Sequence, residues 1–266
     1  MKVFKILTSG LMAVALCVGF TSCSDDDENV GDTIDTEAVF TNGWPKSAPG
    51  IYSITRNAEG LVTEMETSGG DVTFEYHNIK TRAEGEAYVL MTLRHRGETT
   101  YEAKLSLGSN GFVKSAEGTE YEEGYTEHDN WGFGYNSDGQ LNYMSFRSTN
   151  SPDEETRITY SNGDITQVTK TDTEDDGFTC GFGYTSDEVT TPINNIGSVM
   201  LYDEMLNVDL DQMEVVYYAG LLGRATRHLP VSLYYDNMTY YFEWGINDSG
   251  LPEWVTIDGY REYFEW

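Results

Sequence analysis

The chain has 266 residues, with 45 acidic and 16 basic side chains, and its net charge is −29. This excess of acid argues against binding to nucleic acid and against adhesion to anionic lipid, since both need a basic face. It permits divalent cations, basic partners or simple colloidal solubility. Beyond the N-terminal segment no stretch approaches about 18 apolar residues, which excludes a transmembrane helix there.

Residues 1–22 are typical of a lipoprotein signal peptide. Lys2 and Lys5 supply the positive start, residues 6–20 are mostly apolar, and Thr-Ser-Cys follows. The pattern resembles a bacterial lipobox with Phe20 where leucine is usual. We expect Cys23 to carry the acyl chains, palmitate among them, so that the mature protein is anchored to the membrane and does not span it. The alternative is an ordinary secreted protein with an incidental cysteine.

The segment 23–48 is predicted to be an acidic, flexible tether. Its start, Ser-Asp-Asp-Asp-Glu at 24–28, resembles the acidic export tag of surface-exposed lipoproteins of gut Bacteroidetes. We therefore expect a lipid-anchored protein of the outer membrane that faces the cell exterior. Removing residues 1–22 takes away two lysines and no acids, so the net charge changes from −29 to −31.

Cysteine usage gives no disulfide framework. After removal of the leader, Cys180 is the one cysteine besides Cys23. It alternates with Phe178 and Phe182, which is typical of a small core residue on a strand.

From residue 49 to 266 the sequence predicts a single antiparallel β domain. Short stretches with period-two alternation are separated by Gly- and Asn-containing turns, as in successive hairpins. Residues 116–130 break this pattern, and we expect them to form an acidic loop. The predicted strands are 51–56, 61–67, 71–77, 88–95, 99–107, 112–115, 131–135, 140–146, 157–160, 164–170 and 177–185.

The clearest unit is 131–146, WGFGYNSDGQLNYMSF. Gly-Phe-Gly-Tyr at 132–135 recurs at 181–184, and Tyr-Phe-Glu-Trp at 241–244 recurs at 263–266, which favours a repeated strand–turn–strand array. A turn with left-handed Gly139 predicts that Tyr135 lies opposite Leu141, and Phe133 opposite Tyr143. The bare glycines of the opposite face favour sharp coiling there over close approach by another backbone or a ligand.

The segment near 195–225 departs from the strand pattern. Leu206, Leu210, Met213, Val216 and Tyr217 follow a helical period, and Gly220 or Gly223 is a natural end. We expect a short helical insert that plugs or caps one end of a curved sheet; a surface excursion is the alternative.

The predicted fold class is all-β. A meander of about 14 strands is too large for a flat open sheet, so we expect it to be curled or closed into a soluble, barrel-like sheet. An integral pore is the less favoured alternative: Trp266 ends an alternating aromatic strand, but most predicted strands are shorter than a membrane-spanning strand and both faces carry charges.

The layout resembles a family of gut Bacteroidetes surface lipoproteins of unknown function with a porin-like antiparallel β fold. The resemblance comes from the lipobox with its acidic tag, from the Phe-x-Tyr hairpins, and from Tyr-Tyr-Ala-Gly-Leu-Leu-Gly at 217–223 leading to Leu-Pro at 229–230. It would cover most of 49–266. It implies a barrel-like fold and brings no activity with it.

Motifs for catalysis or metal binding are missing from the sequence, and we expect no enzyme, no metal site and no cofactor. No His-Glu-x-x-His, Cys-x-x-Cys, Gly-x-Ser-x-Gly or phosphate-binding loop occurs. His128 beside Asp129 is the single local pair of histidine and carboxylate. Asp172, Glu174 and Asp176 resemble the start of a calcium loop, but Gly183 stands where the bidentate Glu belongs, so calcium is a weak alternative.

Aromatic residues are the more informative feature, with 19 Tyr, 11 Phe and 5 Trp. Flat rings stack on the C–H face of sugars, and Trp131, Tyr135, Tyr241 and Trp244 are the candidate ligand-binding residues. The alternative is that Trp131, Trp244 and Trp266 line the interior of the curved sheet.

The sequence therefore favours a surface lipoprotein that acts as a non-enzymatic binding or scaffold module for a polysaccharide or a protein. One alternative is a glycan hydrolase whose two carboxyl groups, about 5–10 Å apart, lie in a cleft lined by Trp or Tyr. The other is the pore described above.

Overall fold

The structure is a computed structural model that describes residues 39–79, 87–122, 124–173, 177–200, 208 and 210–266. These residues belong to one compact unit, Asp32–Trp266. The signal peptide, Cys23 and the acidic tag lie outside the described residues. Packed side chains begin within the segment expected to be a tether, since Val39 and Phe40 are 2% and 3% exposed.

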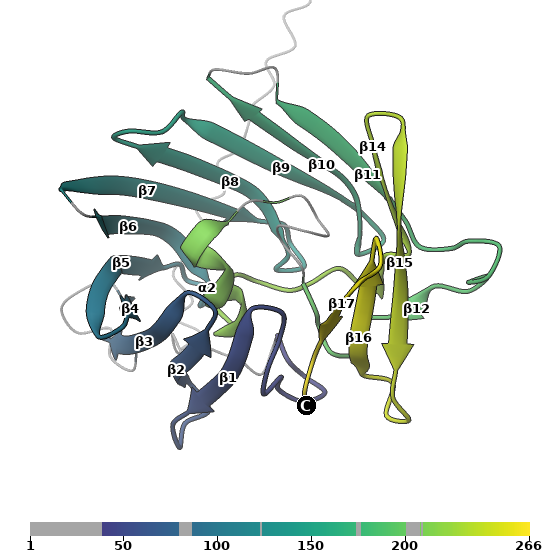
Figure 1. Cartoon of the computed structure of the whole chain (residues 1–266), viewed down its shortest axis with the longest axis horizontal. Helices are drawn as coiled ribbons and strands as arrows, with labels where there is room; N and C mark the ends of the chain where they lie inside the picture. Colours follow the sequence, from purple (N-terminus) through teal and green to yellow (C-terminus); the bar gives the residue numbers. More distant parts are fainter. Residues whose placement is uncertain (1–38, 80–86, 123, 174–176, 201–207, 209) are drawn as a thin grey trace, which may run out of the picture. The chain divides into compact units, whose positions relative to one another are not determined.

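The described residues form one antiparallel sheet of 15 strands, close to the expected number, plus a separate pair of short strands (Figure 1). Neighbours in the large sheet are neighbours in sequence, except that β14 follows β11. The predicted all-β meander is thus confirmed. The main strands are β1 (Ile51–Arg56), β2 (Val62–Thr67), β3 (Gly70–His77), β4 (Tyr88–His95), β5 (Glu98–Leu107), β6 (Val113–Glu122), β7 (Tyr125–Tyr135), β8 (Leu141–Ser148), β9 (Glu154–Ser161), β10 (Asp164–Asp172), β11 (Phe178–Gly183), β14 (Ser232–Tyr235), β15 (Met238–Ile246), β16 (Pro252–Ile257) and β17 (Tyr260–Tyr263), and the separate pair is β12 (Ile193–Asn194) with β13 (His228–Leu229).

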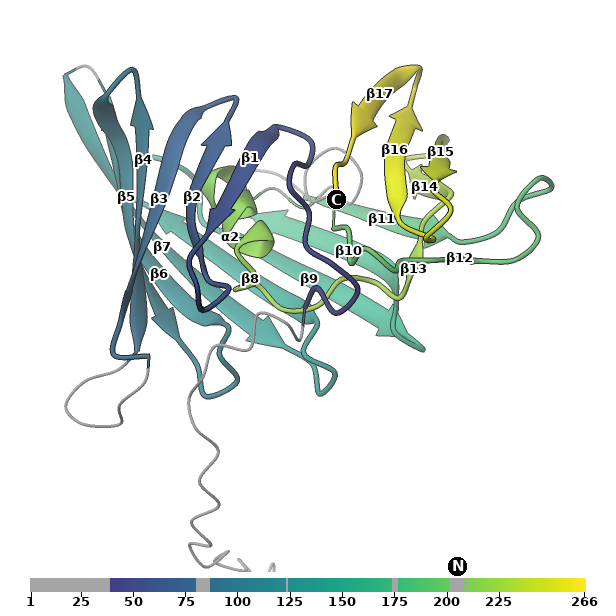
Figure 2. The ribbon, with the colours of Figure 1, turned by 90° about the horizontal axis from the view of Figure 1, so that it is seen from below.

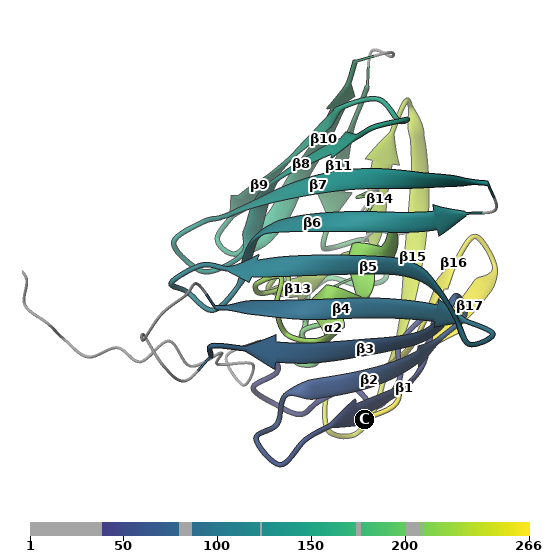
Figure 3. The ribbon, with the colours of Figure 1, turned by 90° about the vertical axis from the view of Figure 1, so that its left-hand side faces the viewer.

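The sheet is curled but its strand ladder is not closed (Figure 3). In the described part of the chain, β1 pairs with β2 alone and β17 with β16 alone. The two ends of the sheet meet through the segment before β1, where Ser47 and Glu265 form an isolated bridge. The Lys46 N–H donates to the Glu265 carbonyl at 2.7 Å. Of the two predicted arrangements, curled or closed, the structure has the curled one.

Three hairpin turns share an Asn-x-x-Gly sequence, which begins at Asn57, Asn136 and Asn247. In each turn the Asn Oδ1 accepts two backbone N–H groups at 2.9–3.1 Å, from the residues two and four positions later. The glycine has a φ of +75° to +83°, a region in which a side chain is strained. The left-handed conformation predicted for Gly139 is confirmed.

One of the two residue pairs predicted for the 131–146 unit is confirmed, and the other is wrong. Tyr135 does lie opposite Leu141, but a bulge follows between Gly134 and Tyr135. Phe133 therefore lies opposite Met144, and Tyr143 lies on the other face, opposite Gly134. The predicted pairing of Phe133 with Tyr143 was wrong because one extra residue in a strand exchanges the two faces.

The loop predicted for residues 116–130 is wrong as well: 116–122 belong to the long strand β6, and 125–130 belong to β7. Alternation did not indicate these strands because their inward positions include Gly118, Glu120 and Asp129, which are small or acidic. Alternation of apolar and polar side chains is lost when the inner face is polar.

Three outward-facing glycines, Gly134, Gly183 and Gly245, lie beside cross-strand aromatic residues. A methyl group on Gly245 would lie 2.1 Å from the indole of Trp254, and one on Gly183 would lie 2.8 Å from the hydroxyl of Tyr234. At Gly134 the nearest atom would be Cβ of Tyr143, at 3.2 Å. These three glycines leave room for the neighbouring side chain, which is the physical reason for a glycine at each position.

The helical insert lies on the concave side of the sheet (Figure 2). It consists of a 3-10 turn, η2 (Asp211–Met213), and a short helix, α2 (Glu214–Tyr218). The helix ends in a Schellman motif at Gly220, with Leu221 N–H donating to Val216 O at 3.1 Å. Leu206 lies outside the described residues. Among those described, no helix is long and apolar enough to cross a membrane.

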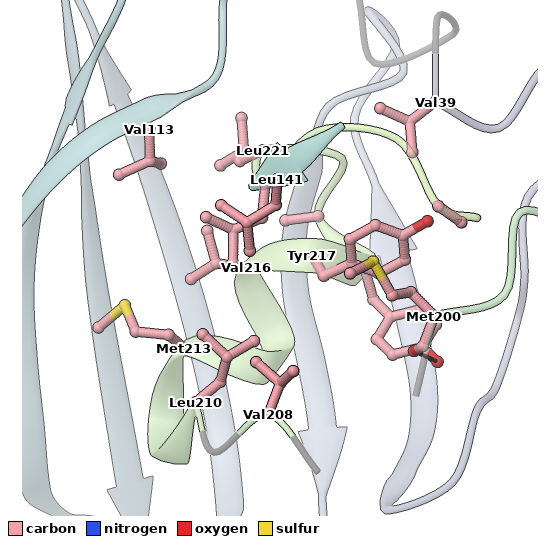
Figure 4. Packing of buried hydrophobic residues seen from close by; sticks show 14 of the residues in the cluster. Val39, Val113, Leu141, Met200, Val208, Leu210, Met213, Val216, Tyr217 and Leu221 are labelled. Carbon is pink, nitrogen blue, oxygen red and sulfur yellow. Dashed lines mark hydrogen bonds between the residues drawn. The ribbon is translucent and has the colours of Figure 1, made fainter. Parts of the chain in front are cut away.

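The insert is part of the core, as the plug interpretation predicted. Val216, Tyr217 and Leu221 are fully buried (Figure 4). They pack in one cluster with sheet residues such as Val113 and Leu141. The alternative of a surface excursion is wrong, because an exposed loop could not bury these apolar side chains.

Residues 221–229, which we call the rim segment, cross the turns at one end of the sheet. Leu221 O, Arg224 N and Arg227 N bond to Val113 N, Gly139 O and Gly163 O at 2.8–2.9 Å. The contacts recur every three residues, which is about 10 Å of extended chain, and this matches the width of one hairpin, about two strand spacings. The rim segment thereby joins three hairpins along one rim.

Tyrosines close the gaps between these hairpins. The hydroxyl groups of Tyr135, Tyr160 and Tyr184 each donate to a backbone carbonyl 19 to 22 residues earlier, at 2.7–2.8 Å. The acceptors are Val113, Leu141 and Ile165, near the starts of β6, β8 and β10. The tyrosine that ends both Gly-Phe-Gly-Tyr tetrapeptides therefore makes the same structural contact each time, and burial raises the pKa of all three phenols.

Substitution of Leu221 by Ala tests the role of the insert. Because Leu221 is fully buried, we expect Leu221→Ala to lower the free energy of unfolding by about 2–5 kcal/mol, measured by chemical denaturation. Leu90→Ala is the matched control, since Leu90 lies on β4 with 36% exposure; it should cost no more than about 1 kcal/mol. Equal losses in the two variants would contradict a core role for the insert.

Candidate functional site

Two of the four predicted ligand-binding aromatics lie in the core. Trp131 is 5% exposed and stacks with Phe133, with ring centroids 6.1 Å apart, and packs on Phe146 at 4.6 Å. The hydroxyl group of Tyr135 donates to Val113 O, as described above. The interior-lining alternative fits Trp131, and a ligand would reach neither ring without displacing core contacts.

The other two aromatics lie on opposite faces of β15. Trp244 points inward: its indole N–H donates to Pro230 O at 2.8 Å and its ring stacks near Phe264 at 6.4 Å. Tyr241 points outward and is 64% exposed. The structure therefore does not bring the four predicted residues together, and their ligand-binding role stays a prediction.

Tyr241 belongs to a different group, which we call the outer strip: Tyr234, Tyr241, Trp254 and Tyr263. The ladder register places these side chains on the outer face of β14 to β17. These four are the last strands of the sheet (Figure 1). Tyr234 and Tyr263 are 48% and 60% exposed, and Trp254 is partly exposed. Sequence reasoning missed Tyr234, Trp254 and Tyr263 because alternation alone does not say which face is outside.

The ladder register divides the outer strip into two ring pairs. Tyr241 is the diagonal neighbour of Tyr234 across β14 and β15, and Trp254 lies directly opposite Tyr263. Four residues of β15 separate the two pairs, which is about 14 Å of strand.

Charged and hydroxyl groups lie between the two ring pairs. Glu243 and Arg261 flank Thr256 in one row of the ladder, and the Arg261 guanidinium lies 3.7 Å above the Trp254 ring. Arg261 Nε also donates to Thr256 Oγ1 at 3.1 Å. Flat rings next to a carboxylate and a guanidinium are the groups that stack on sugars and hydrogen-bond their hydroxyls.

A separate cavity of about 250 Å³ lies between the concave face and the helical insert. Its wall is mainly apolar, with Ile51, Val72 and Met91 from the sheet and Val215 from α2. None of the four predicted aromatics lines it. Its size is near the lower end for small-molecule pockets.

Three carboxylates are neighbours on the inner face of β6 and β7. Glu120 lies directly opposite Glu127, and Asp129 is two residues farther along β7. Asp129 is 8% exposed, and the Tyr101 hydroxyl lies 3.0 and 3.1 Å from its two oxygens. A side chain at Gly118 would overlap this buried pair.

The environments of these carboxyl groups differ. Burial raises the pKa of Asp129, and burial together with neighbouring carboxylates raises the pKa of Glu120. Hydrogen bonds from Ser148 and Ser151 lower the pKa of Glu127. Opposite shifts in adjacent carboxyl groups are what acid and base roles require, so this trio is where the hydrolase alternative would reside. None of the three lines the cavity.

A histidine–carboxylate pair that the sequence did not indicate joins His228 to Asp164. The Nδ1–Oδ2 distance is 2.8 Å, and the His228 backbone N–H donates to the same carboxylate at 2.8 Å. The two residues are 64 positions apart, so no local motif could reveal them. The pair fastens the rim segment to the first residue of β10. The pair suggested by sequence, His128 and Asp129, does not form: His128 Nδ1 lies 3.2 Å from Thr119 Oγ1.

The weak calcium alternative cannot be placed, because Glu174 and Asp176 lie outside the described residues. Over the described ranges, no group of three or more His, Cys, Asp or Glu side chains is arranged to hold a metal ion. Cys180 is buried and not in a disulfide, and burial raises the pKa of its thiol to about 11.

Comparison with known proteins gives a family and a fold. A family model described as "domain of unknown function (DUF4595) with porin-like fold" matches residues 50–252. A porin-like protein from Bacteroides uniformis is similar in structure, with a TM-score of 0.56, 16% identity, and coverage of 80% of this chain and 85% of that one. A porin-like protein from Bacteroides vulgatus has a TM-score of 0.54, 12% identity, and coverage of 84% and 99%. No curated protein matches.

The shifted carboxyl groups predict opposite pH effects for two variants. The ionised form of Asp129 opposes folding above its raised folded-state pKa, and this penalty is lost as the pH falls towards the ordinary value of 3.8. Asp129→Asn should therefore raise the free energy of unfolding at neutral pH, with a difference from wild type that shrinks in acid.

Glu127→Gln is the control of opposite sign. Its lowered folded-state pKa stabilises the fold above the ordinary value of 4.5, and this contribution is lost as the pH falls through the folded-state pKa. The variant should therefore be less stable at neutral pH and approach wild type in acid. Chemical denaturation between neutral and acid pH measures the free energy of unfolding of both variants. If both substitutions change this free energy in the same direction at neutral pH, the opposite pKa shifts of Asp129 and Glu127 are refuted.

Proposed function

The chain belongs to the family of domains of unknown function with a porin-like fold, and on this premise we propose that it is a lipid-anchored, outward-facing binding module of the outer membrane. Its ligand is a polysaccharide, which it binds on the outer strip without catalysis. The observation that carries this proposal is that three exposed tyrosines, Tyr234, Tyr241 and Tyr263, lie with the partly exposed Trp254 on the outer face of β14 to β17. Inward aromatics such as Trp131 and Phe133 are committed to packing.

The membrane part of the proposal is supported by the sequence. The leader ends at Cys23, and the acidic residues after it resemble an export tag. Through the acyl chains the partner of the N-terminus is the outer membrane, which leaves the folded unit free to meet ligands outside the cell.

The ligand part is supported by the chemistry of the outer strip. The two ring pairs, about 14 Å apart along β15, can contact separate residues of one linear chain. Glu243 and Arg261 supply an acceptor and donors for hydroxyl groups between them. A net charge of −29 disfavours polyanionic glycans, so a neutral polysaccharide is the expected class.

A glycan hydrolase is the second candidate, favoured by the opposite pKa shifts of Glu127 and Asp129 beside Tyr101. Against it, the Tyr101 hydroxyl already donates to the buried Asp129 carboxylate. The pore alternative has less support, because the insert occupies the concave side of the sheet.

The anchor is tested by Cys23→Ala. Without the thiol no acyl chain can be attached, so we expect loss of palmitate label and release of the protein from the membrane fraction. Cys17→Ala is the matched control, because Cys17 lies inside the apolar stretch of the leader; it should keep the label. Protease treatment of intact cells should digest the wild-type domain. Unchanged fractionation of Cys23→Ala, or full protection from protease, would overturn the anchored, outward-facing assignment.

The outer strip is tested by Tyr241→Ala and Trp254→Ala in affinity gels that contain neutral polysaccharides. Truncating a central aromatic contact typically costs about 2 kcal/mol, or roughly 30-fold in Kd. Tyr125→Ala is the control, since Tyr125 is 48% exposed but lies on β7. The outer strip is rejected as the glycan site if gels retain both strip variants as strongly as they retain Tyr125→Ala. It is also rejected if no polysaccharide retains the wild-type protein.

A further inference from the structure

Arg56, the last residue of β1, forms no ion pair with a carboxylate in the part of the chain that the structure describes. Its guanidinium lies 3.9 Å above the ring of Trp44, and its Nη2 donates to the carbonyl of Pro45 at 3.2 Å. Its Nε is buried and has no hydrogen-bond partner. Burial lowers the pKa of Arg56 to about 10, so the side chain is still charged at neutral pH.

The missing partner is unexpected in a chain with 45 acidic and 16 basic side chains. Arg147 and Arg157 each pair with carboxylates, at 2.7 and 3.4 Å. Within the described ranges no carboxylate forms an ion pair with Arg56. A buried charge with an unused donor is costly unless something supplies the acceptor.

Tyr76, on β3, has a second unused donor. Its hydroxyl oxygen is buried and has no hydrogen-bond partner. Burial raises its pKa, while the nearby Arg56 lowers it, so the two side chains are close enough to interact electrostatically. The phenol stays protonated at neutral pH and can donate.

We infer that Arg56 and Tyr76 form a binding site for a small oxyanion of the phosphate or carboxylate type. Trp44 covers one face of the guanidinium, which leaves its edge for in-plane hydrogen bonds. The Nε–H and the remaining N–H groups form the fork that fits two oxygens of such an anion, and the Tyr76 hydroxyl can donate to the same group. Arg56 is the single cation that this proposed site uses to bind the anion.

The anion can be a free ion or a lipid headgroup. The large negative charge of the chain opposes broad adhesion to an anionic surface, so recognition has to come from direct hydrogen bonds at Arg56. We therefore expect the soluble ion to be the ligand. This inference does not depend on the outer strip, which lies on other strands.

The test uses the whole mature chain with sodium phosphate, sodium acetate and sodium chloride at equal ionic strength. Phosphate or acetate should raise the melting temperature above its value in chloride, since a ligand stabilises the state that binds it. The Arg56 Nε–H resonance, assigned with Arg56→Lys, should shift during the titration. Vesicles of phosphatidylcholine with and without phosphatidic acid form the second arm: a shift there assigns the site to a headgroup, and a shift with free ions alone assigns it to a soluble anion.

Three variants make the inference falsifiable. Arg56→Gln should weaken phosphate binding roughly ten-fold, and Tyr76→Phe about three-fold, since both lose donors to an anion. Tyr76→Phe should leave the melting temperature in chloride unchanged or higher, because it removes a buried hydroxyl without a partner; this readout is independent of whether Arg56→Gln folds. Arg261→Gln is the matched control, since Arg261 also stacks on a Trp ring, at 3.7 Å, but its Nε has an acceptor.

The inference is overturned if phosphate, acetate and chloride affect wild type equally, or if Arg56→Gln and Tyr76→Phe keep the full phosphate response. The inference is supported if Arg261→Gln keeps the full phosphate response and Arg56→Gln loses it.

Discussion

The fold depends on a match between two spacings. An extended chain advances about 10 Å in three residues, and one hairpin of the sheet occupies about the same width. The rim segment uses this match at residues 221, 224 and 227, whose backbone groups bond to three successive hairpins. A segment that must keep this register cannot also leave the sheet, so the insert before it is held on the concave side. The buried Gln140 side chain reinforces the contact, with Nε2 donating to Gly163 O and Ala225 O at 2.8 and 2.9 Å.

A filled concave side changes what the aromatic residues can do. Inward rings such as Trp131 and Phe133 meet other apolar side chains, and the repeat tyrosines use their hydroxyl groups to join strands at the rim. What remains for recognition is the outer surface and the few polar groups that packing leaves without partners. The outer strip and the Arg56 site are of these two kinds, and they lie on different strands.

The sequence predicted what short-range chemistry controls. Alternation and Asn-x-x-Gly turns are local, so the meander, the turn at Gly139 and the helical insert were predictable. The bulge beside Gly134 was not, because its single extra residue leaves no trace in the pattern and moves Tyr143 to the outer face. The electrostatic interaction of Arg56 with Tyr76 and the hydrogen bonds of His228 with Asp164 join residues 20 and 64 positions apart, which only the folded chain brings together.

The bridge between Ser47 and Glu265 has a consequence for how such domains can vary. A closed barrel must satisfy a fixed relation between strand number, tilt and shear. Here the sheet ends meet through one isolated bridge, so that relation does not constrain the ladder. A hairpin could be gained or lost at this seam without changing the register of any other pair. The seam thus gives the fold a place where its circumference can drift during evolution while the rim contacts of the central hairpins are preserved.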